Sequence, residues 1–195
     1  MLDALISSQT RIKLLLKFFL NSDTTAYLRG LETEFGDSSN GIRLELNRLE
    51  DAGMLVSQTE GNKKVFKANT HHPLFSEIHS LVRKHLGLDQ IVDQVARRLG
   101  DLDSVFLAGA FAKGMDSQIV DLVFVGDVDK RYLFELVEKA EGLIKRKIRY
   151  LIYTPEEFIR LPRLSNEPQP LLLWAKESYE VTKLRSGEES SEVTK

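Results

Sequence analysis

The sequence predicts a mixed α+β protein of two domains, a mainly helical N-terminal half followed by a half of the α/β type. In the first half, apolar residues recur at helical spacing and are interrupted by one hairpin pattern around Gly61. After residue 104, β-branched and aromatic runs of strand length alternate with helical segments. A chain of 195 residues, 42% of them hydrophobic, can form two cores of ordinary size.

The first predicted element is an amphipathic helix within residues 1–20, MLDALISSQTRIKLLLKFFL. Arg11, Lys13 and Lys17 interrupt its apolar residues at helical intervals. The segment also lacks the basic start and the small-residue cleavage site of a signal peptide. We therefore expect it to be the first helix of the first domain.

Two further helices and a hairpin are predicted between residues 25 and 68. The apolar residues of TAYLRGLETEFG have helical spacing, and the polar segment DSS offers N-cap side chains for a second helix that starts near Asn40. Gly53 is expected to end that helix in the left-handed conformation. VSQTEGNKKVFKA then has the form of a hairpin that turns at Glu60-Gly61-Asn62. This order predicts a winged helix-turn-helix domain over residues 1–88, which includes a linker helix that begins at Pro73.

The second of these helices presents hydrogen-bonding side chains on one face, and such side chains suit base edges and phosphates. A helix that enters the major groove beside a basic hairpin is a DNA-reading geometry. The candidate DNA-binding residues are Ser38, Ser39, Asn40, Arg43, Asn47, Lys63 and Lys64. Glu45 and Glu50 on the same helix would repel phosphate if they faced it. The alternative is that this winged-helix domain contacts proteins instead of DNA.

The charge balance predicts how the first domain would bind double-stranded DNA. Residues 1–88 contain eleven Lys or Arg and ten Asp or Glu, whereas residues 89–195 contain sixteen and nineteen. Affinity from phosphate neutralisation would be weak for one near-neutral monomer, so we expect a homodimer that engages two half-sites. The apolar stripes at Leu14 to Phe18 and Leu74 to Leu86 are the expected dimer contacts.

Composition excludes several classes of protein. The chain has no cysteine, which excludes disulfides and thiolate metal sites. It has no apolar run near twenty residues, so we expect no membrane-spanning segment and a cytoplasmic location. The four histidines have no close carboxylate cluster, and we expect no metal site and no cofactor.

The second domain is expected over residues 89–184. VFLAGAFAKG, IVDLVFVG and KIRYLIYT read as strands, and KRYLFELVEKAEGLIKR between the last two reads as a helix. TPEEFIRL predicts a helix with a capping box formed by Thr154 and Glu157, and LLLWAKESYEV predicts a further ordered element. The tail, residues 185–195, is small and polar and is expected to be disordered.

The segment GAFAKGMDSQIVDLVFVG resembles the minimal nucleotidyltransferase family. Active members carry a Gly-Ser pair on a tight loop, another glycine, and two aspartates that flank one residue on a strand. The loop holds nucleotide phosphates and the paired carboxylates bind metal ions. Gly109, Lys113 and Gly114 match the loop, but Ala110 stands at the position of the serine.

The resemblance leaves one metal-binding carboxylate, Asp121. The second aspartate of the pair would fall on Ile119 or on Val123, depending on the register. The third acidic residue of the family would fall within KIRYLIYT, where Arg149 and Tyr150 offer no carboxylate. The resemblance therefore implies a catalytically degenerate domain without catalytic residues. Gly109, Lys113, Gly114 and Asp121 remain candidates for binding a small phosphate-bearing effector.

Over about residues 8–182, the chain resembles an ArsR-like winged helix followed by a nucleotidyltransferase-like domain. From this resemblance we expect a DNA-binding transcriptional regulator, not an enzyme, whose second domain serves dimerisation or ligand sensing. Two alternatives stay open. One is an active nucleotidyltransferase that a winged helix carries to its target, and the other is an antitoxin-like protein-interaction module.

Overall fold

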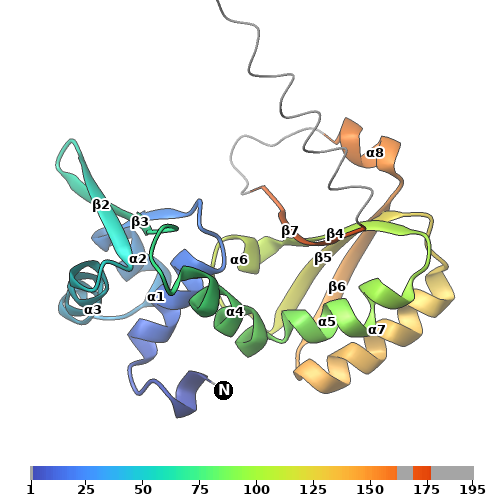
Figure 1. Ribbon diagram of the computed structural model, residues 1–195, viewed down its shortest axis with the longest axis horizontal. Helices are drawn as coiled ribbons and strands as arrows, with labels where there is room; N and C mark the ends of the chain where they lie inside the picture. The colour runs from blue at the N-terminus through green and yellow to red at the C-terminus, as the bar shows by residue number, and fades with distance from the viewer. Residues whose placement is uncertain (1, 162–168, 177–195) are drawn as a thin grey trace, which may run out of the picture. The chain divides into compact units, whose positions relative to one another are not determined.

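The computed structural model describes residues 2–161 and 169–176, which Figure 1 traces from blue to red. The chain divides into two compact units, residues 1–87 with 110–117 and residues 88–109 with 118–195. Both units combine helices with a sheet, so the predicted mixed α+β class is confirmed. Each helix within the described residues is too short or too polar to cross a membrane.

The first unit consists of helices and a small antiparallel sheet. Its elements are η1 (Leu2–Ala4), α1 (Gln9–Phe19), β1 (Thr25–Tyr27), α2 (Leu28–Phe35), α3 (Ser39–Asp51), β2 (Leu55–Glu60), β3 (Lys63–Ala68) and α4 (Phe75–Leu86). The sheet order is β1-β3-β2. The predicted hairpin is present, and Gly61 at its turn has a φ of +60°. Gly53 has a φ of +71° just after α3, as expected for a left-handed helix end.

Helix α1 is the centre of the first core. Leu14, Phe18 and Phe19 are fully buried, and α1 packs against α3 and α4. The stripe Leu14 to Phe18 is therefore used inside the unit, and our expectation that it contacts a second copy is wrong. Burying these side chains within one chain already removes their apolar surface from water. Leu74, which precedes α4, and Leu81 on α4 remain 50% and 40% exposed.

Glu45 ties α3 to α1 from the inside of the unit and does not face solvent. Its side chain accepts hydrogen bonds from Arg11 Nε at 2.7 Å and from Arg48 Nη1 at 3.1 Å. Burial by itself would raise the pKa of Glu45. The hydrogen bond from Arg11 and the charges of both arginines outweigh burial and leave the pKa below its ordinary value.

The second unit is built on a four-stranded mixed sheet. Its elements are α5 (Leu88–Gln94), η2 (Ala96–Arg98), β4 (Leu102–Ala108), α6 (Gly109–Ala112, of which Gly109 alone belongs to this unit), β5 (Ile119–Gly126), α7 (Lys130–Ile144), β6 (Lys147–Tyr153), α8 (Pro155–Arg160) and β7 (Leu171–Ala175). The strand order is β6-β5-β4-β7, with β5 and β6 parallel and the other pairs antiparallel. The predicted capping box of Thr154 and Glu157 is present. The predicted disordered tail lies outside the described residues.

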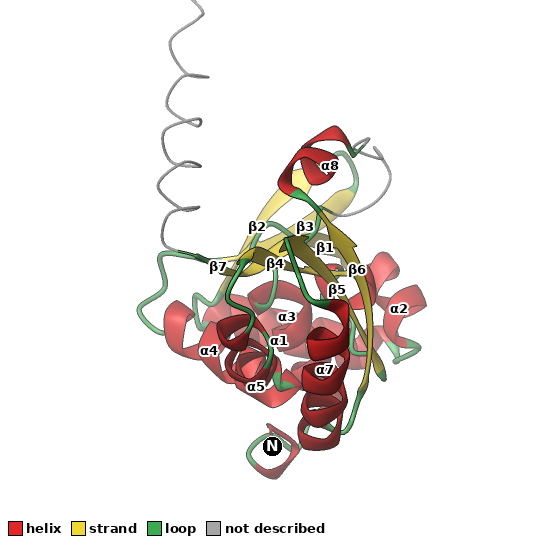
Figure 2. Cartoon of the chain, turned by 90° about the vertical axis from the view of Figure 1, so that its right-hand side faces the viewer, coloured by secondary structure: helices red, strands yellow, loops and turns green. Residues whose placement is uncertain are grey.

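Alternation along β5 assigns its side chains to two faces of the sheet. Leu122 and Phe124 are buried on the face that α5 and α7 cover. Val123 and Val125 lie on the other face, in a cluster with Phe106, against which Phe158 of α8 packs. Figure 2 shows α7 and α8 on opposite sides of this sheet. Asp121 shares the face of Val123, since the two are two positions apart along the strand.

We predict that Glu45→Gln destabilises the protein by about 1–2 kcal/mol near pH 7, since Arg11 loses its charged acceptor. The folded-state pKa of Glu45 is lowered, so its contribution is present above the unfolded value of about 4.3 and is lost as the pH falls through the folded pKa. Urea unfolding of the natural protein and of Glu45→Gln between pH 7 and pH 3 measures this gap, the difference between their free energies of unfolding. Glu77→Gln, an exposed change on α4, is the control, and a gap that persists at the lowest pH contradicts the prediction.

Candidate functional site

The end of β4 brings a left-handed glycine against a carboxylate. Gly109 follows Ala108 with a φ of +62°, a conformation that favours glycine. The register pairs Ala108 with Asp121 on β5, so the Asp121 side chain lies beside the turn. A Cβ added to Gly109 would overlap the Asp121 carboxylate. Glycine is therefore required here for its conformation and for the space it leaves.

Arg149 on β6 binds the same carboxylate from the other side. The parallel register pairs Asp121 with Arg149, and Arg149 Nε donates to Asp121 Oδ1 at 2.5 Å. The Asp121 side chain is 17% exposed and that of Arg149 is 72% exposed. The hydrogen bond and the negative charge of Asp121 raise the pKa of Arg149 above its usual value. Gly109, Asp121 and Arg149 form a corner at the end of β4. This corner combines one sheltered carboxylate with one solvent-facing guanidinium.

The residues at this corner do not fit a resident pair of metal ions. Ile119, two residues before Asp121, is 43% exposed and offers no ligand, and its partner across the strands is Lys147. Lys147 Nζ instead binds Glu141 Oε2 at 2.7 Å. The described residues contain no cluster of three metal-ligating side chains. One carboxylate that is already bound to a guanidinium lacks the charge to hold two divalent ions.

The rest of the glycine loop belongs to the first unit, where α1 binds its backbone. Lys17 is buried, and its Nζ donates to the carbonyl oxygen of Lys113 at 2.8 Å and pairs with Glu34. Asn21 Nδ2 donates to another carbonyl of the loop at 3.0 Å. Gly114 has a φ of +70°, and a Cβ there would lie 2.6 Å from the Cα of Lys17. Of the four predicted ligand-binding residues, the structure brings Gly109 and Asp121 together, while Lys113 and Gly114 pack against α1.

The side chains predicted to bind DNA on α3 have mixed roles. Ser38 is the N-cap, and its Oγ accepts from the backbone N–H of Gly41. Ser39 Oγ donates to a carboxylate oxygen of Glu32. The other predicted residues of this helix, Asn40, Arg43 and Asn47, are exposed. Leu44 lies among them and is 50% exposed, an apolar residue that we did not single out from the sequence.

The two lysines at the hairpin tip make contacts within the chain. Lys64 Nζ pairs with Glu50 Oε2 at 2.5 Å, and Lys63 Nζ lies 4.3 Å from the centre of the Tyr27 ring. Hydrogen bonds from Lys64 and Ser57 lower the pKa of Glu50 below its usual value. Part of the positive charge predicted to face phosphate is therefore neutralised by a carboxylate of α3.

Comparisons with known proteins found partial likenesses to solved structures. No family model matches the chain, and no curated protein matches it. A tri-AMPylated Shewanella oneidensis HEPN toxin in complex with MNT antitoxin is 12% identical, covers 55% of this chain and 88% of its own, and has a TM-score of 0.34. A candidate nucleotidyltransferase from Sulfolobus solfataricus is 24% identical, with coverages of 52% and 89% and a TM-score of 0.33. A toxin–antitoxin structure with AMP-PNP is 12% identical, with coverages of 53% and 88% and a TM-score of 0.36.

These findings contradict our functional prediction. The similar structures are a nucleotidyltransferase and toxin–antitoxin proteins, so the prediction of an ArsR-like, DNA-binding transcriptional regulator is wrong. The prediction that the protein is not an enzyme is contradicted by the same structures, which include an AMPylated toxin and a complex with AMP-PNP. The Lys64–Glu50 pair gives a physical reason for the first error, because the sequence did not show that Glu50 binds Lys64 and neutralises its charge.

Arg149 is the residue at this corner whose role the sequence analysis missed. The resemblance placed it where the family has an acidic residue, and we treated it only as a lost carboxylate. A cation opposite a lone Asp121 is a signal in itself, since opposite charges on neighbouring strands are expected to pair.

We predict that Gly109→Ala costs more stability than Gly36→Ala. Both glycines have a φ near +65°, so each substitution strains the backbone by about 1 kcal/mol. Nothing lies within 4 Å of a Cβ at Gly36, whereas the Gly109 variant must displace Asp121. We expect an additional loss of about 1–3 kcal/mol for Gly109→Ala in urea unfolding followed by circular dichroism. Equal losses in the two variants would contradict this close packing.

Proposed function

We propose that the protein is a nucleotidyltransferase-type protein. It binds a nucleoside triphosphate at the corner of Gly109, Asp121 and Arg149 and transfers the nucleotidyl group to a hydroxyl group of a protein partner. The hydroxyl oxygen bonds to the α-phosphorus and loses its proton to solvent, while the bond to the β-phosphate breaks and pyrophosphate leaves. The observation that carries this proposal is the pairing of Asp121 with Arg149 beside the left-handed turn at Gly109. Its position matches the loop and strand in which the sequence resembles the nucleotidyltransferase family.

Arg149 supplies the positive charge that phosphates require. A guanidinium presents donors on three nitrogens in one plane and binds phosphate through paired hydrogen bonds. The bond to Asp121 uses Nε, and the two terminal nitrogens are suited to a phosphate group. Because its side chain is largely exposed, Arg149 can reach a ligand in solvent.

Asp121 is a positioning residue in this proposal. Its carboxylate holds the guanidinium by one hydrogen bond and cannot shift towards Gly109 without meeting the backbone of that turn. Magnesium would enter with the nucleotide, whose phosphates and bound water provide most of its ligands. A fixed cation at the phosphates stabilises charge that develops during transfer, the role that an arginine has in other phosphoryl-transfer sites.

The first unit is inferred to be a winged-helix module that contributes to partner binding. The element order α1-β1-α2-α3-β2-β3 and the sheet order β1-β3-β2 support this inference. Leu44 supports a protein partner, since an exposed leucine between Arg43 and Asn47 is better suited to an apolar contact than to phosphate. Binding of a protein partner by the first unit agrees with an antitoxin-like interaction.

Label transfer tests the proposal. The full chain is incubated with each of the four α-labelled ribonucleoside triphosphates and Mg²⁺ or Mn²⁺, with itself and with cell-extract proteins as acceptors. We expect protein-bound label, and a loss of about 100-fold or more in Arg149→Ala and Asp121→Asn, since each removes part of the phosphate-binding pair. Lys147→Ala is the matched control, because it breaks an ion pair on the same strand and should retain the activity.

Two outcomes would overturn this function. One is the absence of label with all four nucleotides and both metal ions. The other is label that is unchanged in Arg149→Ala, which would place the reaction elsewhere.

A further inference from the structure

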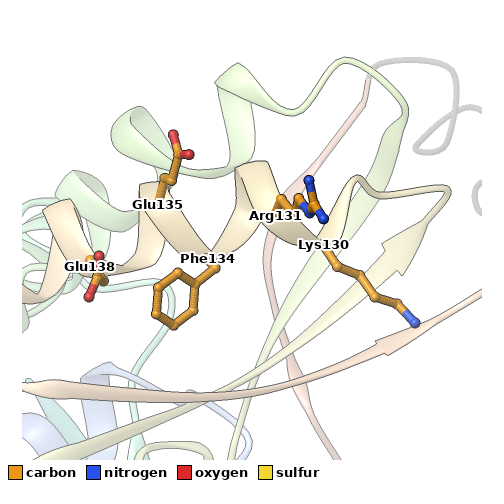
Figure 3. Close-up of a pocket in the computed structure, with 5 residues that line it drawn as sticks. All are labelled: Lys130, Arg131, Phe134, Glu135 and Glu138. Carbon is orange, nitrogen blue, oxygen red and sulfur yellow. The ribbon is translucent and has the colours of Figure 1, made fainter.

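Helix α7 presents one solvent-exposed face that combines an aromatic side chain with charges of both signs. Phe134 is 54% exposed, and Lys130 and Arg131 lie on its N-terminal side. Glu135 and Glu138 lie on its C-terminal side, and the five residues line a shallow hollow. Figure 3 shows the two basic residues towards one end of this stretch and Glu138 at the other, with Phe134 between them. We call these five residues the α7 face.

The helix itself is held firmly in the second unit, so the α7 face has a defined geometry. Leu133, Leu136, Val137 and Ala140 are buried on its opposite side. Its first turn is capped by Asp129, whose carboxylate accepts from the backbone N–H groups of two residues. The five residues of the α7 face follow the i, i+4 and i, i+8 spacing that keeps side chains on one side of a helix.

The charges of the α7 face make little use of one another or of the rest of the described chain, where the charge of Glu138 contributes to raising the pKa of Lys147. There, Lys130, Arg131, Glu135 and Glu138 take part in no ion pair. An exposed phenylalanine alone needs no explanation. The placement of Lys130 and Glu138 does, because these two opposite charges are symmetric about Phe134: Lys130 precedes it by the same number of residues by which Glu138 follows it.

We propose that α7 pairs antiparallel with α7 of a second copy of this chain, about a two-fold axis at Phe134. In such an isologous contact, a residue of one copy that precedes Phe134 faces the residue of the other copy that follows Phe134 by the same number of positions. Lys130 of each copy then faces Glu138 of the other, and the two Phe134 rings pack together. A parallel pairing would place Lys130 against Lys130 and Glu138 against Glu138, and the repulsion disfavours it. The charge order therefore selects both the partner and its direction.

This contact lies on a surface different from the stripes that the sequence suggested for a dimer, and it does not depend on the proposed nucleotide site. One helix from each copy buries less area than a standard interface, so we expect a dissociation constant of roughly micromolar size. Its ion pairs are exposed, so salt should weaken it.

Charge exchange tests the pairing by sedimentation equilibrium of the full chain. Lys130→Glu places a carboxylate opposite Glu138 of the second copy, and Glu138→Lys places an ammonium group opposite Lys130. We expect each single variant to dimerise at least about tenfold more weakly than the natural protein. The double variant K130E/E138K restores both pairs and should regain the original affinity within about threefold. Lys84→Glu, the same charge reversal at an exposed position on α4, is the matched control and should have no effect.

Mixing the two single variants gives the sharpest result. In a mixed dimer, the carboxylate introduced by K130E in one chain faces the ammonium group introduced by E138K in the other. The unchanged Glu138 of the first chain faces the unchanged Lys130 of the second. We expect native mass spectrometry to show heterodimers where each variant alone is monomeric.

Three outcomes would overturn this pairing. The first is a natural protein that stays monomeric at roughly 100 µM, well above the expected micromolar dissociation constant. The second is a dimer that single charge reversals leave unchanged. The third is a dimer that neither the double variant nor the mixture restores.

Discussion

The carboxylate of Asp121 lies between a residue that has to be glycine and a guanidinium that binds it, and the corner depends on both contacts. The register of β5 with its two neighbours creates them, because it places Ala108 on one side of Asp121 and Arg149 on the other. A slip of β5 by one residue would turn Asp121 to the face where Phe124 is buried. The apolar residues of that face therefore hold the polar corner in place, since exposing them would cost more than the ion pair provides.

The glycine loop after β4 has a structural use that its resemblance to a phosphate-binding loop does not reveal. Gly114 approaches the backbone of Lys17 so closely that any side chain would displace it. Lys17 in turn binds the loop carbonyl of Lys113 with a buried ammonium group. A buried lysine is stable only when it is paired and hydrogen-bonded, and Glu34 completes its environment. The glycine at position 114 is thus explained by packing without reference to a ligand.

The acidic residues of α3 show how tertiary contacts change the meaning of a charge pattern. In the sequence, Glu45 and Glu50 stand beside polar residues and count against phosphate binding. In the structure Glu45 is an internal partner of Arg11, and Glu50 neutralises Lys64 of the hairpin. The surface that remains on α3 includes the cation Arg43 and the apolar Leu44, so it is not the uniformly polar surface that the sequence suggested.

Local patterns determined most of the elements of this protein. Helical periodicity predicted α1, α3 and α7, alternation and apolar runs predicted β4, β5 and β6, and the spacing from Thr154 to Glu157 predicted the capping box. These succeeded because a helix, a strand and a cap depend on residues that are close in sequence.

Only the tertiary structure decided which residues meet. It buried the apolar stripe of α1 that we assigned to a dimer, joined residues 110–117 to the first unit, and paired Arg149 with Asp121 across 28 positions of sequence. Such contacts arise from strand register and from competition for buried surface, and both are properties of the whole fold. A single sequence records which side chains are available, and the packing of distant segments decides which of them are already used.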